Sequence, residues 1–212
     1  MRPVAYVGCA ALMCCCLSSC AGPTLTLTSQ DVPALASDPP QQIPFRAGLF
    51  IGRQYEKLNY GGRGALWFTG RKGAYVDVDV RSLFEQAARR MFKEVIPIGA
   101  TETPAEWRER HLDVVVSIGS ITCLAEDQGL RERWPPVRSL IFATIKAKWD
   151  IFSADGKLIT STTVAGQGQA RPTRTYSASK EALAKAFEAH FSKAYDSFVA
   201  TAWWRDSSWK TD

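Results

Sequence analysis

The feature that most constrains the fold is an alternating segment followed by a tight-turn sequence. Residues 144–151 alternate between polar and apolar side chains, which predicts a strand with one buried and one solvated face. Asp155 and Gly156 follow, and this pair readily adopts the positive φ angles of a two-residue hairpin turn. The threonine-rich residues 158–164 are expected to return as the second strand and to end at the glycines of residues 166–168. The alternation predicts burial of Ile145, Ala147, Trp149 and Ile151 and exposure of Lys146 and Lys148.

Two segments have helical periodicity. The first is expected to begin at Asp77 or Asp79, either of which can cap a helix, and to end before Pro97. The second is expected to run from about residue 177 to residue 202. In both segments apolar residues recur at steps of three and four, so each helix has one apolar face. These faces consist of Val80, Leu83, Phe84, Ala87, Ala88, Met91 and Phe92 in the first helix, and of Leu183, Phe187, His190, Phe191, Ala194, Tyr195 and Phe198 in the second.

The order of the expected elements predicts an α+β fold. Further strands are expected at residues 45–51 and 112–118, with a short strand at 65–68 between glycine-rich turns. This order is typical of a two-layer sandwich, in which a mostly antiparallel β-sheet has two helices packed on one face. We assign this domain to residues 44–202 and a tryptophan-containing tail to residues 203–212.

The N-terminus has the pattern of a secretion signal. Residues 1–17 carry one positive charge, Arg2, and an apolar run that is too short to span a bilayer. Residues 17–20 read Leu-Ser-Ser-Cys and resemble the bacterial lipobox, in which a leucine and two small residues precede an obligatory cysteine. In lipobox chemistry the cysteine thiol takes a diacylglyceryl group, and the signal peptidase cuts just before it. We therefore expect residues 1–19 to be removed and the lipidated Cys20 to anchor the chain in a membrane.

The residue after the lipobox cysteine bears on which membrane is used. In Gram-negative lipoproteins an aspartate there usually retains the protein at the inner membrane, and this chain has Ala21. The sequence therefore favours the periplasmic face of the outer membrane. An ordinary secretion signal with a different cleavage site is the alternative.

Processing would leave one thiol. Of the six cysteines, only Cys123 lies beyond Cys20, so no internal disulfide is expected. Cys123 is expected to be a buried small hydrophobic residue, and pairing between chains is the alternative.

Residues 20–43 are expected to form a tether between the anchor and the domain. They are rich in proline, serine, threonine and glutamine, a composition typical of linkers. Residues 24–28 are an exception, because their Thr-Leu-Thr-Leu-Thr alternation would suit an edge strand.

Sequence patterns for catalysis are weak in this chain. His190 is expected to be a core residue, whereas His111 and Asp113 would share one face of a strand. The sequence contains no Gly-x-Ser-x-Gly nucleophile elbow and no close cluster of metal ligands. The segment from Gly64 to Arg71 has one residue too many between its glycines for a phosphate loop, and arginine stands where lysine is required. We therefore expect neither enzyme activity nor a cofactor.

Arginine and tryptophan residues in two loops are the candidates for binding a partner. The loops are expected at residues 53–73 and 125–138, and both residue types are enriched at binding hot spots. The net charge of +5 is mild and permits contact with anionic lipid, while a location in the envelope argues against a nucleic-acid partner. For each residue, the alternative is a solvated side chain that keeps the protein soluble. The candidates are Arg71, Arg131, Arg133 and Trp134.

Several segments resemble the YajG-like lipoproteins of the bacterial envelope. The resemblance covers about residues 43–202 and implies an envelope lipoprotein with no catalytic residues to carry over. It also extends to small α+β domains of envelope machines, such as the TolB amino-terminal domain and the curli secretion lipoprotein. Residues 61–73 and the Trp203-Trp204 pair depart from the family pattern. The similar segments are the strands at 45–51 and 113–116, the first helix at 82–84 and 91–95, the hairpin at 154–157 and 166–168, and the closing helix at 182–183.

Together these features predict a lipid-anchored periplasmic protein that docks onto another envelope component without catalysis. An accessory lipoprotein subunit of a lipid or solute transport system is the first alternative. A hydrolase with an unrecognised site is the second.

Overall fold

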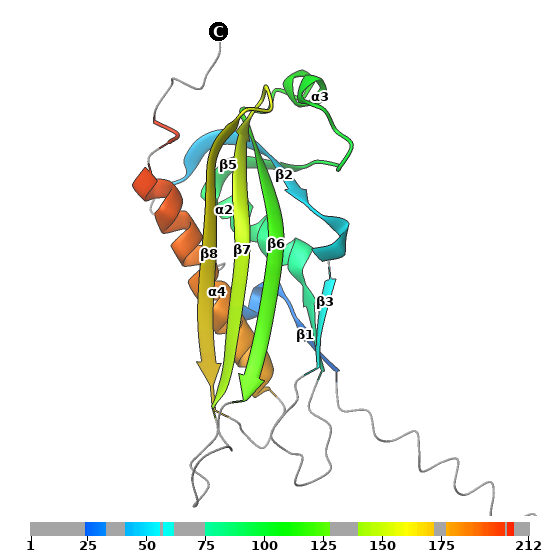
Figure 1. The fold of residues 1–212 in the computed structure, drawn as a ribbon, viewed down its shortest axis with the longest axis vertical. Helices are drawn as coiled ribbons and strands as arrows, with labels where there is room; N and C mark the ends of the chain where they lie inside the picture. Colours follow the sequence, from blue (N-terminus) through cyan, green and yellow to red (C-terminus); the bar gives the residue numbers. More distant parts are fainter. Residues whose placement is uncertain are drawn as a thin grey trace, which may run out of the picture.

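The computed structural model describes residues 24–32, 41–55, 57–61, 75–127, 140–171, 177–201 and 203–205. Its main feature is a five-stranded sheet with the strand order β5-β2-β6-β7-β8 (Figure 1). A three-stranded sheet with the order β1-β4-β3 lies beside it. The strands of the large sheet are β2 (Ile43–Ile51), β5 (Phe92–Pro97), β6 (Val114–Asp127), β7 (Ile141–Ser153) and β8 (Leu158–Ala170). Those of the small sheet are β1 (Thr24–Leu27), β3 (Lys57–Gly61) and β4 (Tyr75–Asp79).

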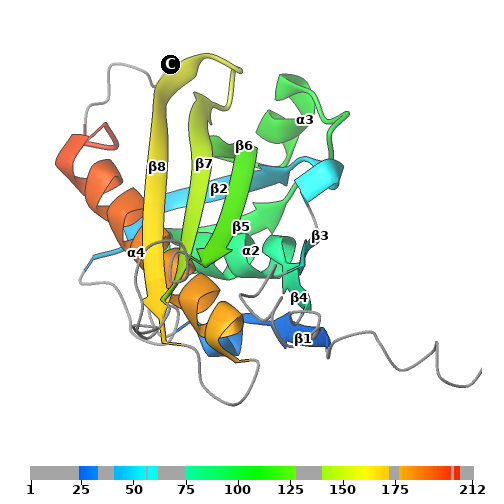
Figure 2. The ribbon, with the colours of Figure 1, turned by 60° about the horizontal axis from the view of Figure 1, so that its bottom comes forward.

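The helices are α2 (Val80–Met91), α3 (Pro104–Glu109) and α4 (Ala178–Thr201), with the short 3-10 turns η1 (Ser29–Asp31) and η3 (Arg53–Tyr55). Helices α2 and α4 lie on the same face of the large sheet (Figures 1 and 2). The α+β class with two helices on one sheet face is therefore confirmed. The large sheet is mixed, because β2 pairs in parallel with both β5 and β6, whereas β6, β7 and β8 are antiparallel.

The main core lies between the large sheet and the two long helices. Trp149 of β7 is fully buried there, and its ring centroid is 5.3 Å from that of Phe84 on α2 and 5.6 Å from that of Phe198 on α4. Phe187 and Phe191, also from α4, complete this aromatic cluster. The expected apolar faces of both helices and the expected register of the hairpin are confirmed.

The first helix is shorter than its sequence pattern suggests. Asp79 is the N-cap, and its Oδ1 accepts a hydrogen bond from Ser82 N at 3.1 Å. The helix ends at Met91, and the next six residues form strand β5. The expectation that the helix continues nearly to Pro97 was wrong because these residues pair in parallel with β2, which lies more than 40 positions earlier.

The hairpin strands extend beyond their expected ends. Strand β8 runs through Gly166 and Gly168 to Ala170, so these glycines do not end the strand as expected. Both lie beneath α4, where a Cβ on Gly166 would come within 2.1 Å of the Ala186 carbonyl oxygen. The glycines therefore allow the helix backbone to lie directly on the sheet.

Strand β6 continues to Asp127 by means of a β-bulge. The pairing register with β7 shifts between Gly119 and Thr122, and Ser120 adopts a φ of 50°. Before the bulge Val116 and Ile118 are buried, and after it Ile121 and Cys123 are buried. One extra residue thus restores the apolar face, as bulges do. The expected burial of the Cys123 thiol is confirmed.

Part of the expected tether belongs to the folded domain. Strand β1 pairs in parallel with β4, and Leu27 and Val32 are buried in the main core. The Asp31 carboxylate also forms an ion pair with Lys180 of α4 at 2.9 Å. The edge-strand alternative is therefore the one observed, with the strand at Thr24–Leu27. Trp203 of the expected tail is also buried, with its ring 5.8 Å from that of Phe45.

Candidate functional site

The residues proposed from sequence as contact sites lie outside the part of the chain that the structure describes. They are Cys20, Arg71, Arg131, Arg133 and Trp134. The short strand expected at 65–68 lies outside it as well. The remaining candidates, His111 with Asp113 and His190, are described, together with the surfaces of the sheet and of helix α2.

His190 is a buried core residue, as expected. Its Nε2 accepts a hydrogen bond from Trp149 Nε1 at 3.1 Å, so the proton of the neutral ring is on Nδ1. The pKa of His190 is lowered to about 4, mainly by burial and to a smaller extent by the positive charge of Lys193, while a hydrogen bond with the backbone of Val164 opposes the shift. A histidine that stays neutral inside an aromatic core serves packing rather than proton transfer.

This depressed pKa predicts acid sensitivity of the fold. Above about pH 6.5 the histidine is neutral in both the folded and unfolded states. Below that pH only the unfolded state takes up the proton, until the pH reaches about 4. The free energy of unfolding should therefore fall by about 2–3 kcal/mol between pH 7 and pH 4.5 because of this group. Urea unfolding at both pH values measures the change.

Two variants isolate this contribution. His190→Gln keeps an acceptor for Trp149 Nε1 but cannot titrate, so most of the histidine-dependent loss should disappear. His111→Asn is the control, because His111 is exposed with a φ of 54°, and asparagine tolerates that backbone region. A His190→Gln variant with the same acid sensitivity as the parent protein contradicts the assignment.

The hydrogen bonds seen at His111 and Asp113 involve the backbone, and none joins the two side chains. The His111 N–H donates to the Arg108 carbonyl oxygen at 2.9 Å and closes the turn after α3. The Asp113 carboxylate accepts a hydrogen bond from Arg46 N at 2.7 Å, and Asp113 N donates to the Arg46 carbonyl oxygen at 2.9 Å. Asp113 thus joins the start of β6 to β2.

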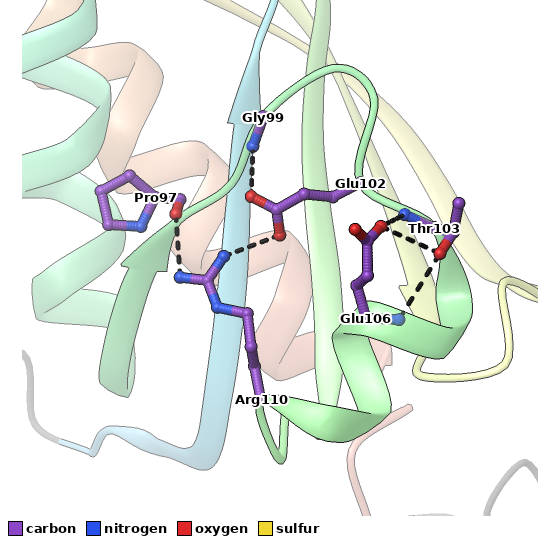
Figure 3. Close-up of polar contacts among 6 residues, drawn as sticks. All are labelled: Pro97, Gly99, Glu102, Thr103, Glu106 and Arg110. Atoms are coloured by element: carbon purple, nitrogen blue, oxygen red, sulfur yellow. Dashed lines mark hydrogen bonds and ion pairs between the residues drawn. The ribbon is translucent and has the colours of Figure 1, made fainter.

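The carboxylates around α3 also have structural roles (Figure 3). Glu106 forms a capping box with Thr103, whose backbone N–H donates to it at 2.6 Å and is the largest cause of the lowered pKa of Glu106. Glu102 accepts from Gly99 N at 2.8 Å and pairs with Arg110 at 2.7 Å. This network holds α3 over the second face of the sheet, where Ile98, Leu112 and Val115 form a small apolar cluster.

Beyond α3, the second sheet face is solvated. Lys146 and Lys148 of β7 are exposed, as expected, and Thr122 of β6 and Thr163 of β8 lie beside them in the register. Lys148 forms an ion pair with Asp150 at 3.0 Å, and Leu124 is 60% exposed at the far end of β6.

The outer edge of β8 is partly covered by lysines of α4. Lys193 Nζ donates to the Ala165 carbonyl oxygen at 3.2 Å, and Lys185 Nζ donates to that of Gln169 at 3.3 Å. Lysines on an edge strand hinder pairing with another strand. These lysines therefore hinder pairing of another strand with the described part of β8.

A shallow hollow of about 380 Å³ lies on the exposed side of α2. Its side chains already interact with one another, because Glu85 pairs with Arg89 at 2.6 Å and Asp79 caps the helix. Small-molecule sites are mostly apolar with a few convergent polar groups, and this hollow has a polar lining. The lining residues are Asp79, Arg81, Ser82, Glu85, Gln86 and Arg89.

Two further properties concern membranes and metals. Within the ranges that the structure describes, no helix combines the length and apolarity needed to cross a bilayer. In the same ranges, no three histidine, cysteine, aspartate or glutamate side chains come together as a metal site would require.

Comparison with known proteins shows similarity to solved structures at low identity. No protein-family model matches the chain, and no curated protein matches it. A Xanthomonas campestris protein of the family-model DUF330 is 12% identical with a TM-score of 0.48, covering 85% of this chain and 95% of that one. A minor lipoprotein from Acinetobacter baumannii is 9% identical with a TM-score of 0.39, covering 76% and 96%. A hypothetical protein from Chlamydia trachomatis is 12% identical with a TM-score of 0.36 and the same coverage. These values do not place the chain in a family.

Proposed function

We propose that this protein is a lipid-anchored component of the bacterial envelope that acts by docking, without catalysis. The observation that carries the proposal is the Leu-Ser-Ser-Cys sequence at residues 17–20, directly after an apolar signal run. Two or three acyl chains on Cys20 make a stable anchor, whereas a single chain binds only marginally. The periplasmic face of the outer membrane is the proposed location, because Ala21 is not an aspartate.

The described surfaces support docking over chemistry. His190 belongs to the core, and the carboxylates of Asp113, Glu102 and Glu106 are used by backbone hydrogen bonds and by an ion pair. The exposed sheet face and the polar hollow offer surface for contact but no convergent reactive groups. Arg71, Arg131, Arg133 and Trp134 remain the proposed contact residues from the sequence.

The anchor is tested by changing its cysteine. Cys20→Ala should abolish lipidation and processing, because the thiol is the acceptor of the diacylglyceryl group. Cys16→Ala is the matched control, since it removes a thiol from the same signal segment and should leave processing intact. Mass spectrometry of the mature N-terminus measures both outcomes.

Two results would count against the proposal. An unmodified N-terminus beyond residue 20 in the parent protein would show that the signal is of the ordinary secreted type. Turnover of a substrate at a rate that depends on His111 would show that the protein is an enzyme.

A further inference from the structure

Strand β8 is an outer strand of the large sheet and has the properties of a strand that can accept another one (Figures 1 and 2). It has 13 residues, Leu158–Ala170, and none of them is charged or a proline. Its pairing with β7 runs without a register shift from Ala170 to Thr160. Edge strands usually avoid further pairing by short length, charges, proline or bulges, and β8 uses none of these along this stretch.

The protection of this edge comes from helix α4. Lys193 Nζ donates to the Ala165 carbonyl oxygen at 3.2 Å, and Lys185 Nζ donates to another edge carbonyl oxygen at 3.3 Å, that of Gln169. The backbone groups of successive residues in a strand point to opposite sides, so Gln167 presents its N–H and C=O to the same outer side as Ala165 and Gln169. Each ammonium group therefore lies where the N–H of an added strand would lie.

Carboxylates can draw these lysines away from the edge. The Lys185 side chain is 50% exposed and also pairs with Glu181 at 2.7 Å, and Lys193 is exposed. An ammonium group binds a carboxylate more strongly than it binds a neutral carbonyl oxygen. A strand that brings carboxylates to the edge can therefore displace the lysines from the backbone, whereas a neutral or basic strand cannot.

The spacing of the two lysines fits an extended chain. Lys193 follows Lys185 by eight positions, which corresponds to about 12 Å along α4. Four residues of a strand span about 13 Å, and side chains four positions apart lie on the same face of a strand. Carboxylates at positions i and i+4 of an added strand therefore match both lysines.

From these observations we propose that the outer edge of β8 accepts an extended acidic segment of a partner protein by strand addition. The backbone of the segment pairs with the outward N–H and C=O groups around Gln167, and two carboxylates four residues apart bind Lys185 and Lys193. The backbone pairing supplies affinity, and the lysines select for negative charge. This surface is separate from the loop contacts of the proposed function, and it does not require lipidation of Cys20.

The charge selection is tested with a fluorescent synthetic peptide of nine residues. The peptide alternates threonine and valine and has glutamate at its third and seventh positions. Its binding to the full protein in detergent is measured by fluorescence anisotropy. The same peptide with lysine at both positions should bind at least about tenfold more weakly. Equal affinity of the two peptides, or no binding of the glutamate peptide, overturns the proposal.

Two double variants locate the contact. Lys185→Ala combined with Lys193→Ala should weaken binding of the glutamate peptide at least about fivefold and should abolish its advantage over the lysine peptide. Lys146→Ala combined with Lys148→Ala is the control, because it removes the same charge from the solvated face of the same sheet and should leave the affinity unchanged. Equal losses in both double variants mean that the peptide senses only the overall charge, and the proposal then fails.

Backbone pairing is tested separately from charge, with the protein unchanged. Two glutamate peptides are N-methylated, one on the odd-numbered and one on the even-numbered residues, so that each lacks the N–H donors of one strand edge. Only the edge that pairs with β8 needs its donors, so one of the two peptides should bind at least about tenfold more weakly than the other. Equal binding of both peptides means that the carboxylates alone make the contact, and strand addition is then wrong.

Discussion

Replacing Gly166 by alanine should destabilise the domain by about 3 kcal/mol or more, because the new methyl group meets the backbone of α4. A Cβ at this position would lie 2.1 Å from the Ala186 carbonyl oxygen and 2.3 Å from His190 N. Neither atom belongs to a flexible side chain, so the helix itself must move away from β8. That movement would also strain the hydrogen bond between Trp149 and His190.

Gly119 supplies the matched control. It lies in the same sheet, in β6, and a Cβ added there meets nothing within 4 Å. Gly119→Ala should therefore change the free energy of unfolding by no more than about 0.5 kcal/mol. Urea unfolding midpoints of the two variants and the parent protein measure the difference. Similar midpoints for Gly166→Ala and Gly119→Ala would show that α4 does not lie directly on β8.

Trp149→Ala should cost about 3–5 kcal/mol, the range for emptying a large aromatic site in a core. The Trp149 side chain is fully buried among Phe84 and Phe198, and its indole N–H donates to His190. The substitution therefore leaves a cavity and a buried acceptor without its donor. Trp149→Phe should cost less, about 1–3 kcal/mol, because it retains most of the volume and loses the hydrogen bond.

Lys148→Ala is the control on the neighbouring position of the same strand. The Lys148 side chain is 45% exposed, and its ion pair with Asp150 lies on the solvated face. Exposed ion pairs contribute little, so this change should cost about 0.5 kcal/mol. Equal urea midpoints for Trp149→Ala and Lys148→Ala would contradict the register of β7.

The lowered pKa of His190 links the predictions for Gly166 and Trp149, because His190 is close to both residues. His190 lies on α4, where its backbone is close to Gly166, and its ring accepts a hydrogen bond from Trp149. Gly166→Ala should therefore also reduce the acid sensitivity of the fold, since a displaced helix exposes the histidine to water. The three positions act as one packed unit, so their effects on stability should not be additive.

The sequence alone determined those elements whose pattern of apolar and polar residues is local. The alternation around Trp149, the turn at Asp155 and Gly156, and the apolar face of α4 all depend on neighbours within a few residues. Each pattern specifies both the element and the side that it buries. The burial of His190 followed from the same argument, because it lies on that helical face.

The tertiary structure decided features that depend on residues far apart in the chain. Phe92–Pro97 became strand β5 because β2 offers it a parallel partner, and residues 24–27 became β1 because β4 does. The bulge at Ser120 interrupts the alternation of β6, so no period-two pattern reveals the full strand. From sequence Gly166 was expected to end the strand, whereas in the structure β8 continues past it and α4 lies directly above it. The sequence by itself thus determined the local elements and the proposed anchor. Only long-range strand pairing and helix packing decided that residues 24–27 and 92–97 form strands and that α4 lies directly on β8.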